Sequence, residues 1–472
     1  MKHYIGGELV CGNGETMEVF DPATGFVAER FPAADATQAQ EALDAAAAAF
    51  PAWSKMSLRQ RGEVILRFAS ALEAERDKII GLLIRETGKP LAGAVYDFEM
   101  LPNCLRFFYE EALRLEGDII LDPDNSHLNL IIRKPIGVVV GYLAWNFPLL
   151  NLGYKLGPVL ASGCTCVLKP SSLTSLASLY VGEVAKASGV PSGVINIISG
   201  PGETLAKAMN SSKIPKMLTL IGSSQTGRKI ITQSATSIKH FSLELGGNAP
   251  AVVCKSADVE SAANHICDIK FGNAGQVCVA ANRVFVHKAV KDTFLRNALA
   301  FISRITLGSG DMPADILMGP MISQKAQTEM ASLVKDAVEK GARVLCGGKP
   351  AEGRGFFFLP TILDGVTPDM RVYKEEIFGP VMPVLAFDDG DDIAAMANDT
   401  EYGLAAYLFT NDLNEALSIS RAIDAGSVSV NAPFYACNLP HGGLKESGIG
   451  KDCSKFSLEE YYGIQRISIQ NA

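Results

Sequence analysis

Apolar side chains recur at every third or fourth position over residues 36–114, which is the period of an amphipathic helix. This spacing predicts one helix capped by Thr37, a second over Arg59–Glu86 and a third over Asp97–Leu115. Residues 1–30 instead hold short apolar pairs between turn residues and predict short strands. The chain is therefore expected to begin with a small strand region followed by helices.

From Ile119 onward, short apolar runs alternate with helical segments. Such alternation is typical of βαβ units, in which helices cover a doubly wound parallel sheet. The expected strands are Gly137–Leu143, Cys164–Lys169, Val194–Ile198 and Met217–Ile221, and the expected helices are Ser175–Ser188, Glu203–Asn210 and Gln225–Ala235.

After Gly246-Gly247 the pattern restarts and predicts a second α/β sheet. Its expected strands include Val252–Val253, Val284–His287, Val344–Cys346, Val381–Leu385 and Ser427–Val430. The fold class is therefore α/β, with a doubly wound parallel-sheet domain over 1–115 and 136–245 and a second α/β domain over 246–448. Residues 116–135 and 449–472 are expected to form a small bridging β element.

Length and charge narrow the picture. A chain of 472 residues exceeds the roughly 250–300 residues at which a single core stops growing, so more than one domain is expected. The formal net charge is −8 and no long Lys/Arg run occurs, which argues against nucleic acid as a partner. The most apolar segment, Leu128–Trp145, is broken by Arg133, Lys134 and Pro135, so no membrane span is expected.

The ten cysteines have no regular spacing and form no CxxC pair. This argues against a zinc ribbon and a disulfide framework, and no metal site is expected. Residues 1–8 lack the apolar stretch of a secretory signal. We therefore expect a reducing, cytoplasmic location, where a thiol stays free.

One cysteine stands out by its neighbours. Cys278 lies within Phe271–Arg283, where glycine, alanine and amide residues surround it. Small neighbours leave room for a second molecule to approach the sulfur, so Cys278 is a candidate nucleophile. Free cysteines are commonly buried core residues and nine others compete for the role, so this stretch alone favours a structural interpretation.

Two glycine motifs of the first sheet indicate a dinucleotide site. Gly200-Pro-Gly202 begins like GxGxxG but lacks the last glycine, and Gly222–Lys229 begins like a P-loop but lacks its Lys-Ser/Thr ending. Each motif alone is more typical of a structural turn. However, Gly222 and Ser223 close a strand and open a helix, whose N-terminus would bind a pyrophosphate.

Lys169, Ser171 and Ser172 also follow a strand, at the edge where ligands bind in open α/β sheets. A lysine there can bind ribose hydroxyls or a phosphate; the alternative is a solvated loop lysine.

Two further side chains suit catalysis at the ends of apolar strands. Glu244 lies between apolar neighbours and glycines, and burial would raise its pKa and make it a general base. The alternative is a strand-end residue paired with Lys239. Asn146 follows a strand and can donate to a developing oxyanion, although by itself it is more typical of a turn before Phe147-Pro148.

Seven motifs occur in one order along the chain: Trp145-Asn-Phe-Pro148, Lys169-Pro-Ser171, Gly222-Ser223, Glu244-Leu-Gly-Gly247, Gly275-Gln-Val-Cys278, Glu375-Glu-Ile-Phe-Gly-Pro380 and Gly442-Gly-Leu-Lys-Glu-Ser-Gly448. With them the chain resembles the NAD(P)-dependent aldehyde dehydrogenase superfamily over essentially its whole length. The resemblance implies a dinucleotide-binding domain, a catalytic domain and a bridging element that crosses to a partner subunit. A homodimer or homotetramer is therefore expected.

The resemblance also implies a role for each matching residue. Cys278 matches the nucleophile, Asn146 the side-chain donor of the oxyanion hole and Glu244 the base that activates water. The residues that match cofactor positions are Lys169 and Glu376 at the riboses, Phe378 beside the nicotinamide ribose, and Trp145, Ser171, Ser172, Gly222, Ser223 and Leu245 along the remaining site.

These roles imply a reaction on a small aldehyde of the semialdehyde or hydroxyaldehyde class. The Cys278 thiolate attacks the aldehyde, a hydride passes to NAD or NADP, and Glu244 activates the water that hydrolyses the thioester. Two alternatives stay open. A coenzyme A-acylating dehydrogenase resembles this chain but usually lacks a base at the position of Glu244. A non-catalytic binding or structural protein on the same fold would have no need of Cys278, Glu244 and Asn146 together.

The chain departs from several family patterns. Many NAD-preferring members carry Glu where this chain has Ser172, and a serine would not repel a 2′-phosphate. We therefore expect NADP to be accepted; whether it is preferred, or Ser172 only weakens discrimination, stays open. Succinate-semialdehyde dehydrogenases usually have arginines where this chain has Gly272 and Tyr154, and often a second cysteine in place of Ala280.

Three residues are candidates for the substrate mouth. Tyr154 is similar to members with an aromatic tunnel for uncharged aldehydes. His441 matches a histidine of lactaldehyde dehydrogenases, which could bond a substrate hydroxyl, and Arg106 on the third helix could attract an anionic tail. A packed tyrosine, a loop histidine and a solvated arginine are equally good interpretations. The sequence does not identify the aldehyde.

Overall fold

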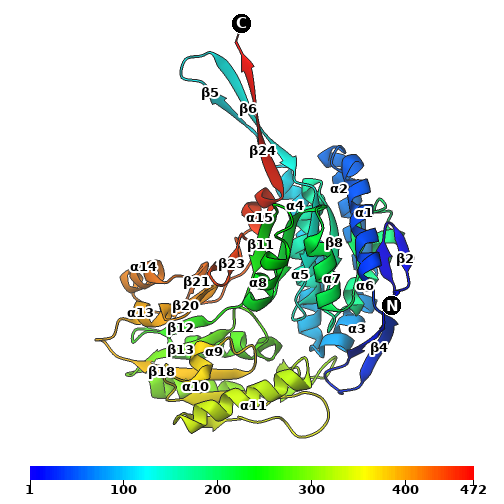
Figure 1. Ribbon diagram of the computed structural model, residues 1–472. Helices are drawn as coiled ribbons and strands as arrows, with labels where there is room; N and C mark the ends of the chain where they lie inside the picture. The colour runs from blue at the N-terminus through cyan, green and yellow to red at the C-terminus, as the bar shows by residue number, and fades with distance from the viewer. Residues whose placement is uncertain (472) are drawn as a thin grey trace.

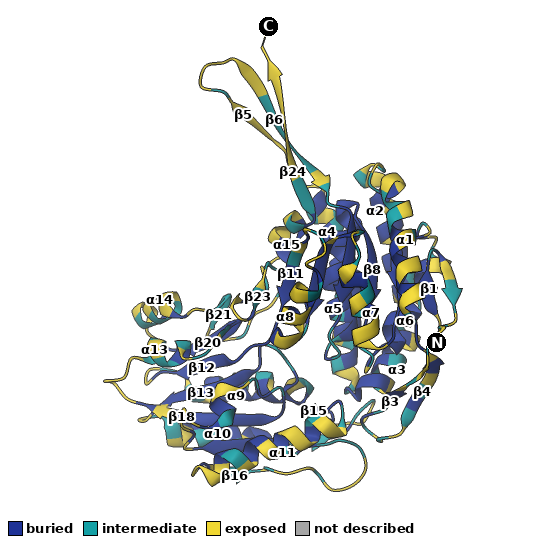
Figure 2. Cartoon of the chain, viewed as in Figure 1, coloured by how far each residue is buried: buried dark blue, intermediate teal, exposed yellow. Residues whose placement is uncertain are grey.

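The computed structural model describes residues 1–471. Two sheet-containing bodies lie side by side, and a narrow three-stranded arm projects from them (Figure 1). Buried residues concentrate in the two bodies, whereas the arm is largely exposed (Figure 2). Within residues 1–471, no helix combines the length and the apolar character that crossing a membrane requires.

The first body contains an eight-stranded sheet whose five central strands are parallel. Its strands β7 and β8 are buried along their whole length, which explains their apolar runs without alternation. In sheet order the strands are β2 (Glu8–Val10), β1 (His3–Ile5), β9 (Ile195–Ile197), β8 (Thr165–Lys169), β7 (Val138–Tyr142), β10 (Pro215–Ile221), β11 (His240–Glu244) and β23 (Gly448–Ile449).

This strand order indicates where a ligand binds. From β7 the chain continues to β8 and β9 on one side, and later to β10 and β11 on the other. In open α/β sheets, ligands bind beyond the carboxyl ends of the strands where the order reverses. Here that point lies between β7 and β10, next to Leu143–Phe147 and Gly222–Ser223.

The second body contains a seven-stranded sheet that is parallel except at β16. One continuous apolar core packs around it. In sheet order the strands are β16 (Arg343–Cys346), β17 (Thr361–Asp364), β18 (Val381–Phe387), β13 (Ala281–His287), β12 (Ala249–Val253), β20 (Ala405–Phe409) and β21 (Ser427–Val430). The α/β fold class with two sheets is confirmed.

A short connection places the two sheets against each other. Leu245–Asn248 runs from the carboxyl end of β11 to the amino end of β12, and Ala249 of β12 pairs with Ala281 of β13. The carboxyl edge of the first sheet therefore meets the amino edge of the second. Glu244, the last residue of β11, and Cys278, just before β13, lie at these two edges.

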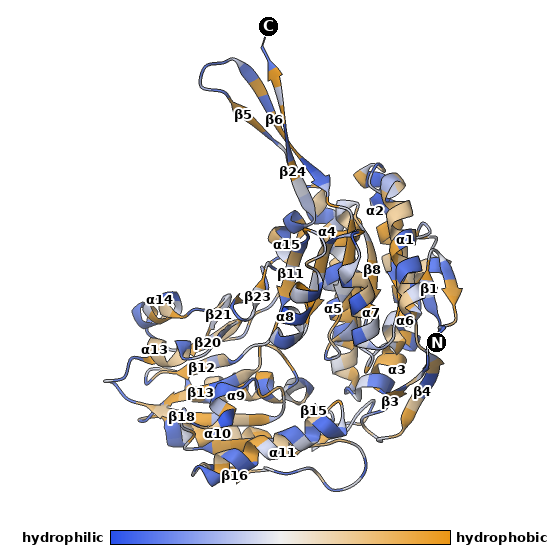
Figure 3. Ribbon diagram, viewed as in Figure 1, coloured by the Kyte–Doolittle hydropathy of each residue, from blue (hydrophilic) through white to orange (hydrophobic). Residues whose placement is uncertain are grey.

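The arm is an antiparallel sheet of β5 (Asp118–Leu121), β6 (His127–Pro135) and β24 (Tyr462–Gln470). Hydrophobic residues occur along it as well as in the two bodies (Figure 3). Of the expected bridging range 449–472, only β24 belongs to this sheet, because α15 (Ser454–Glu460) packs on α4 and α5 of the first body. On this division of sheets we propose the three domains.

Helices flank both sheets, and three small strand pairs complete the fold. The helices are α1 (Ala36–Trp53), α2 (Leu58–Ala74), α3 (Arg76–Thr87), α4 (Leu91–Ala112), α5 (Pro148–Ser162), α6 (Leu176–Ala187), α7 (Gly202–Ser211), α8 (Ser224–Gln233), α9 (Val259–Phe271), the 3₁₀ turn η1 (Gly272–Gly275), α10 (Lys291–Ile302), α11 (Gln324–Glu339), α12 (Arg371–Lys374), α13 (Ile393–Asn398) and α14 (Leu413–Ala422). The strand pairs are β3 (Thr16–Phe20) with β4 (Val27–Pro32), β14 (Ile305–Leu307) with β15 (Ile316–Met318), and β19 (Tyr402–Gly403) with β22 (Leu444–Lys445).

Two sequence predictions about helices are wrong. The first helix is capped by Asp35 rather than Thr37, because the Asp35 carboxylate accepts the Gln38 N–H at 2.9 Å. The single helix expected over Arg59–Glu86 is two helices that meet at Glu75. Its apolar spacing continues across the break because both helices bury one face in the same core, so periodicity alone does not reveal the change of direction.

Candidate active site

A cavity of about 1890 Å³ lies where the two sheets meet. It exceeds the roughly 300–1,000 Å³ of an ordinary small-molecule site, so it has room for a dinucleotide and a substrate together. The candidate residues that line it are Asn146, Glu244 and Cys278 of the catalytic set, Trp145, Lys169, Ser171, Ser172, Gly222, Ser223, Leu245, Glu376 and Phe378 of the cofactor set, and Tyr154 and His441 of the substrate set.

An unusual turn presents Cys278 to this cavity. Asn273, Ala274 and Gly275 in η1 all have positive φ, between 49° and 69°, a conformation that costs about 1–2 kcal/mol for a non-glycine residue. The buried Gln276 side chain holds the turn, because it donates to Pro320 O at 3.1 Å and accepts from the Ile322 N–H at 2.8 Å. The conformation of this turn therefore explains why glycine, alanine and amide residues precede the cysteine.

Glycine at 247 is needed for the same presentation. A Cβ atom there would lie 2.2 Å from the carbonyl oxygen of Cys278. The Glu-Leu-Gly-Gly motif thus lets the end of β11 pass close to the cysteine backbone.

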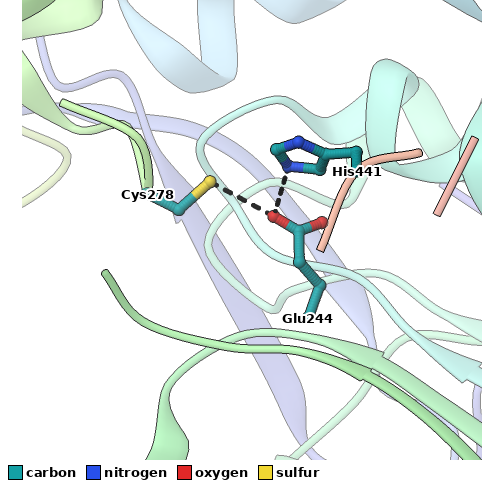
Figure 4. A group of neighbouring side chains, drawn as sticks. All are labelled: Glu244, Cys278 and His441. Atoms are coloured by element: carbon teal, nitrogen blue, oxygen red, sulfur yellow. Dashed lines mark hydrogen bonds and ion pairs between the residues drawn. The ribbon is translucent and has the colours of Figure 1, made fainter. Parts of the chain in front are cut away.

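Three candidate side chains meet in the cavity, and we call this group the catalytic group (Figure 4). The Cys278 thiol lies 3.2 Å from Glu244 Oε1, and the same oxygen lies 2.8 Å from His441 Nε2. Glu244 is 5% exposed, so water does not screen these contacts strongly. The His441 backbone is held by two hydrogen bonds with Asp452, whose carboxylate binds the buried Lys155 ammonium at 2.6 Å.

The expected raised pKa of Glu244 is wrong. Burial does raise the pKa of Glu244, but the charge and hydrogen bond of His441 outweigh burial and place it below its usual range. Burial lowers the pKa of His441, and its contact with Glu244 reverses this and raises it. Burial and the Glu244 carboxylate raise the pKa of Cys278 well above 9, so the thiol is protonated at neutral pH. The group is therefore a carboxylate between a thiol and a histidine whose positively charged form the carboxylate stabilises.

Asn146 lies beside the same thiol-bearing turn. Its amide Nδ2 donates to Gln276 O at 3.1 Å, and its backbone oxygen accepts from Asn273 Nδ2 at 3.2 Å. One N–H of the amide remains to donate into the cavity. Helix α5 begins just beyond, where the buried Asp97 carboxylate accepts the N–H groups of Leu149 and Leu150. Asp97 in turn binds Lys89 at 2.6 Å, so a buried ion pair fixes the segment that carries Asn146.

The cofactor set lies along the first sheet. Ser223 caps α8 by accepting the Thr226 N–H, and the first turn of this helix lines the cavity. Lys169 is 7% exposed, and within residues 1–471 its ammonium has one hydrogen bond, to Pro170 O at 3.3 Å. Burial lowers the pKa of Lys169 to about 8. Its two remaining N–H groups suit ribose hydroxyls or a phosphate, and the alternative of a solvated loop lysine is wrong.

Glu376 completes this half of the site. Its Oε1 accepts the Gly247 N–H at 2.9 Å, and burial raises its pKa to about 7. Its second oxygen is free to accept from a ribose hydroxyl. Phe378 packs edge to face on Trp145 with ring centroids 5.2 Å apart, and both rings line the cavity. These residues fit a nicotinamide dinucleotide.

The prediction that Arg106 lies at the substrate mouth is wrong. It does not line the cavity, because its guanidinium donates to both carboxylate oxygens of Glu73 on α2, at 2.8 and 2.7 Å. This exposed pair joins two helices instead. The alternative pairing of Glu244 with Lys239 is also wrong, since the Lys239 ammonium donates to Ser234 O and Ser237 Oγ.

Sequence reasoning missed several cavity residues. Tyr435 packs its ring 5.9 Å from that of His441, and its hydroxyl lies 2.6 Å from that of Tyr407. Asn151, one turn into α5, donates to the Asn146 side chain at 3.4 Å. The aromatic pair Phe434-Tyr435, six residues before the Pro-His-Gly-Gly run, was an available signal for the first; nothing local marks the second.

One cluster in this site has the geometry of a metal site. The ligand atoms of Glu244, Cys278 and His441 lie within 4.8 Å of one another. They already bond each other as carboxylate, thiol and imidazole, and the expectation that the protein needs no metal stays a prediction.

Here a sheet of the dinucleotide-binding type faces a buried thiol, an amide and a carboxylate. This combination is typical of dehydrogenases that form a covalent intermediate on a cysteine. The sequence model of the aldehyde dehydrogenase family matches residues 10–467, and the chain belongs to that family. It is therefore an NAD(P)-dependent enzyme that oxidises aldehydes.

Known relatives cover nearly the whole chain. The NADP(+)-dependent succinate-semialdehyde dehydrogenase of Escherichia coli K12 is 38% identical over 98% of this chain and 97% of its own. A glutarate-semialdehyde dehydrogenase of Pseudomonas aeruginosa is 37% identical, over 99% of this chain and 97% of its own. The crystal structure of an E. coli NADP-dependent enzyme superposes with a TM-score of 0.97 at 38% identity, covering 100% of this chain and 98% of that one.

Proposed function

We propose that this enzyme oxidises small uncharged aldehydes, with hydroxyaldehydes as the favoured class, to carboxylic acids. The observation that carries the proposal is the contact of one Glu244 oxygen with both Cys278 and His441 inside a cavity that also holds Asn146. A nucleophile, a base and an oxyanion donor converge there, as acyl chemistry on a thiol requires.

In the first half of the reaction, Glu244 accepts the Cys278 proton across their 3.2 Å contact. The thiolate then attacks the aldehyde carbon and forms a thiohemiacetal. The free N–H of Asn146 and the Cys278 backbone N–H hold the oxyanion. A nicotinamide dinucleotide held by Lys169, Glu376 and Phe378 would supply the hydride acceptor, and loss of the hydride would convert the thiohemiacetal to a thioester.

In the second half, Glu244 first passes the thiol proton to solvent and then removes a proton from the water that attacks the thioester; the C–S bond breaks, the acid is released and the Cys278 sulfur takes a proton back. The presence of this base favours hydrolysis over transfer to coenzyme A. His441 is a positioning residue in this proposal: it holds the carboxylate in place and sets its basicity through their 2.8 Å contact.

The charge of the cavity supports an uncharged substrate. Within residues 1–471, the lysines and arginines of its lining are Lys89, Lys169, Arg228 and Lys229. Lys89 is paired with Asp97 and Arg228 with Glu446, and Lys169 and Lys229 belong to the cofactor half. The other half, which contains Cys278 and which we call the aldehyde half, instead presents Tyr154, Tyr435 and other aromatic side chains. His441 also lies in this half, but it is already paired with Glu244, so a substrate carboxylate would find no unpaired cation among the lining residues of the described chain.

Ser172 supports the use of NADP. It follows Lys169 in the cavity lining and brings no negative charge to that position. A 2′-phosphate placed there would meet the Lys169 ammonium without a competing carboxylate, so we propose that NADP is preferred.

One kinetic comparison tests both proposals. Glycolaldehyde, lactaldehyde, succinate semialdehyde and medium-chain alkanals are assayed with NAD and with NADP by the absorbance of the reduced nicotinamide. The carboxylate of succinate semialdehyde would lose its hydrogen bonds to water without gaining a charged partner, and a lost charged hydrogen bond costs about 1.5–3 kcal/mol. The kcat/KM for a hydroxyaldehyde should therefore exceed that for succinate semialdehyde by about tenfold or more. A preference for succinate semialdehyde would contradict the substrate class.

The cofactor arm of this comparison uses Ser172→Glu with Ser172→Gln as its control of equal size. Glutamate should raise KM for NADP by about tenfold or more while leaving NAD unaffected, because only the carboxylate repels the phosphate. An equal effect of both variants would show that size rather than charge acts at this position.

Replacing His441 by phenylalanine should change the pH dependence of thioester hydrolysis. In the wild-type enzyme the imidazolium keeps Glu244 weakly basic until the pH passes the raised pKa of His441, above 6.5, so the rate should rise through that ionisation. In the variant, the charge and hydrogen bond of His441 no longer lower the pKa of Glu244, which becomes a stronger base, and this rise should disappear. Deacylation rates from about pH 5 to 9 measure the change.

His240→Phe is the matched control, because His240 is an exposed histidine of β11, the strand that ends in Glu244; this variant should keep the wild-type profile.

The Glu244–His441 ion pair also links folding to pH. Its stabilisation is complete between the ordinary pKa values of 4.5 and 6.5, and it is lost as the pH rises through the raised pKa of His441 or falls through the lowered pKa of Glu244. An unchanged rate profile in His441→Phe would remove His441 from the mechanism.

We also propose a homodimer or homotetramer formed through the arm. Several of its apolar side chains are exposed, with Ile119, Leu121 and Ile464 at 64%, 76% and 76%. Apolar strands that project in this way favour burial against another subunit. The ten free thiols, including the nucleophile, suit a reducing compartment such as the cytoplasm.

A further inference from the structure

Three cysteines outside the catalytic group gather beside the cavity, and one of them, Cys453, lines it. Cys104 lies in α4, Cys437 lies between β21 and β22, and Cys453 directly precedes α15. The Sγ atoms of Cys104 and Cys437 are 3.4 Å apart, and Cys453 also bonds Cys437. Cys104 and Cys453 are fully buried, whereas Cys437 is partly exposed. The nucleophilic mechanism uses none of these sulfurs.

Cys437 belongs to a segment that forms one wall of the cavity. We call residues 431–443 the wall segment; Tyr435, Ala436 and His441 are among its lining residues. Its backbone is anchored at Cys437, whose carbonyl oxygen accepts the Ser454 N–H at 2.6 Å. A change at the Cys437 sulfur therefore acts on the same wall that carries His441.

We propose that Cys104 and Cys437 form a reversible disulfide that ties the wall segment to α4. A disulfide needs a sulfur separation of about 2.05 Å, so the two atoms must approach by about 1.4 Å, which small side-chain rotations can supply. No other residue lies between them, since the two sulfurs are already in contact.

The chemistry of Cys437 assigns it the first step. Hydrogen bonds from Cys104 and Cys453 lower the pKa of Cys437 and so favour its thiolate form. A low-pKa, partly exposed cysteine beside a second thiol is the usual arrangement of a reversibly oxidised pair. Cys104, protonated and fully buried, is the resolving thiol.

The oxidant in this proposal is a hydroperoxide. The Cys437 thiolate attacks one peroxide oxygen; an S–O bond forms, the O–O bond breaks, and the alkoxide leaves and takes a proton from water. The Cys104 thiol then attacks the sulfenic sulfur. An S–S bond forms, the S–O bond breaks, and hydroxide leaves as water with the thiol proton. The two sulfurs lose two electrons and the peroxide gains them; a dithiol reverses the change.

The test uses the full chain with Cys278→Ser, which removes the catalytic sulfur. After treatment with hydrogen peroxide, the remaining thiols are alkylated and the peptides are mapped by mass spectrometry. We expect a Cys104–Cys437 crosslinked peptide pair that dithiothreitol removes. The pair should be absent when Cys437→Ser is added and present when the exposed Cys11→Ser is added.

Three outcomes would overturn the proposal: no crosslink, a Cys437–Cys453 crosslink, or oxidation of Cys437 to a sulfinic acid without a partner. Hydrogen exchange of the wall segment tests the tether separately. Exchange should slow by about tenfold or more on oxidation of Cys278→Ser, and should not change in Cys278→Ser with Cys104→Ser or with Cys437→Ser. Equal exchange before and after crosslinking would refute the tether. Neither measurement depends on the proposed substrate.

Discussion

Replacing Glu244 by glutamine should stop turnover after one round of reduction. The wild-type carboxylate lies 3.2 Å from the thiol and would take a proton from water in deacylation. General-base catalysis of this kind raises a rate by about 10²–10⁴-fold. Glutamine keeps the shape and the contact with His441 but accepts no proton. The thiol can still ionise to water in the variant, because loss of the carboxylate charge lowers the pKa of Cys278. Rapid mixing should therefore show a burst of reduced cofactor close to one per active site, followed by a steady rate lower by that factor.

The burst separates this prediction from a simple loss of structure. A misfolded variant would give no burst, whereas an accumulated thioester can be identified by the mass of the acylated protein. Glu99→Gln, on an exposed position of α4, is the matched control and should keep wild-type turnover. A steady rate within about threefold of wild type would mean that another group activates the water.

Adding coenzyme A to the wild-type reaction tests the alternative function, transfer of the acyl group to coenzyme A. If the wild-type enzyme transfers its acyl group to coenzyme A, the product changes from the acid to an acyl thioester when coenzyme A is added. We expect the acid in both cases, because Glu244, the proposed base for water, lies buried beside the thiol. An acyl-coenzyme A product would favour the coenzyme A-acylating alternative.

Local signals were sufficient for the residues that follow strands. Lys169, Gly222 and Glu244 each end or follow a run of apolar residues, and the carboxyl ends of parallel strands share one edge of a sheet. The sequence alone therefore predicts that the motifs at these positions belong to one site.

The protonation state of Glu244 could not be predicted in the same way. Its neighbours in sequence are apolar and indicate a raised pKa, but the decisive neighbour, His441, is 197 residues away. The two residues meet because β23, just beyond His441, pairs with β11 at Glu244. This antiparallel edge pairing involves two residues and leaves no period in the sequence.

Buried ion pairs were missed for a related reason. Asp97 was expected only as the start of a helix, yet its carboxylate caps α5, 52 residues later, and binds Lys89. A charged residue on a helix is ordinarily solvated, and only the packing of α4 against α5 removes the solvent. Arg106, nine residues further along α4, shows the opposite case, because it stays at the surface with Glu73.

Cys278→Ser should lower turnover by about four orders of magnitude or more, the largest effect expected in this protein. The serine hydroxyl keeps the size of the group and its contact with Glu244, but it is far less acidic than a thiol and forms no thioester. The fold and the cofactor half should be unaffected, so binding of NAD and NADP, measured by fluorescence quenching, should stay at wild-type strength. Cys346→Ser, a partly buried cysteine outside the cavity lining, should keep full activity.

The sulfur itself gives a second measurement. Because burial and the Glu244 carboxylate raise the pKa of Cys278 well above 9, its alkylation by iodoacetamide should be slow at neutral pH and should accelerate as the pH rises toward that value. In Glu244→Gln the carboxylate charge is gone, so the alkylation profile should move to lower pH. A profile that is the same in both proteins would mean that Glu244 does not control the thiol, and an active Cys278→Ser enzyme would refute the covalent mechanism.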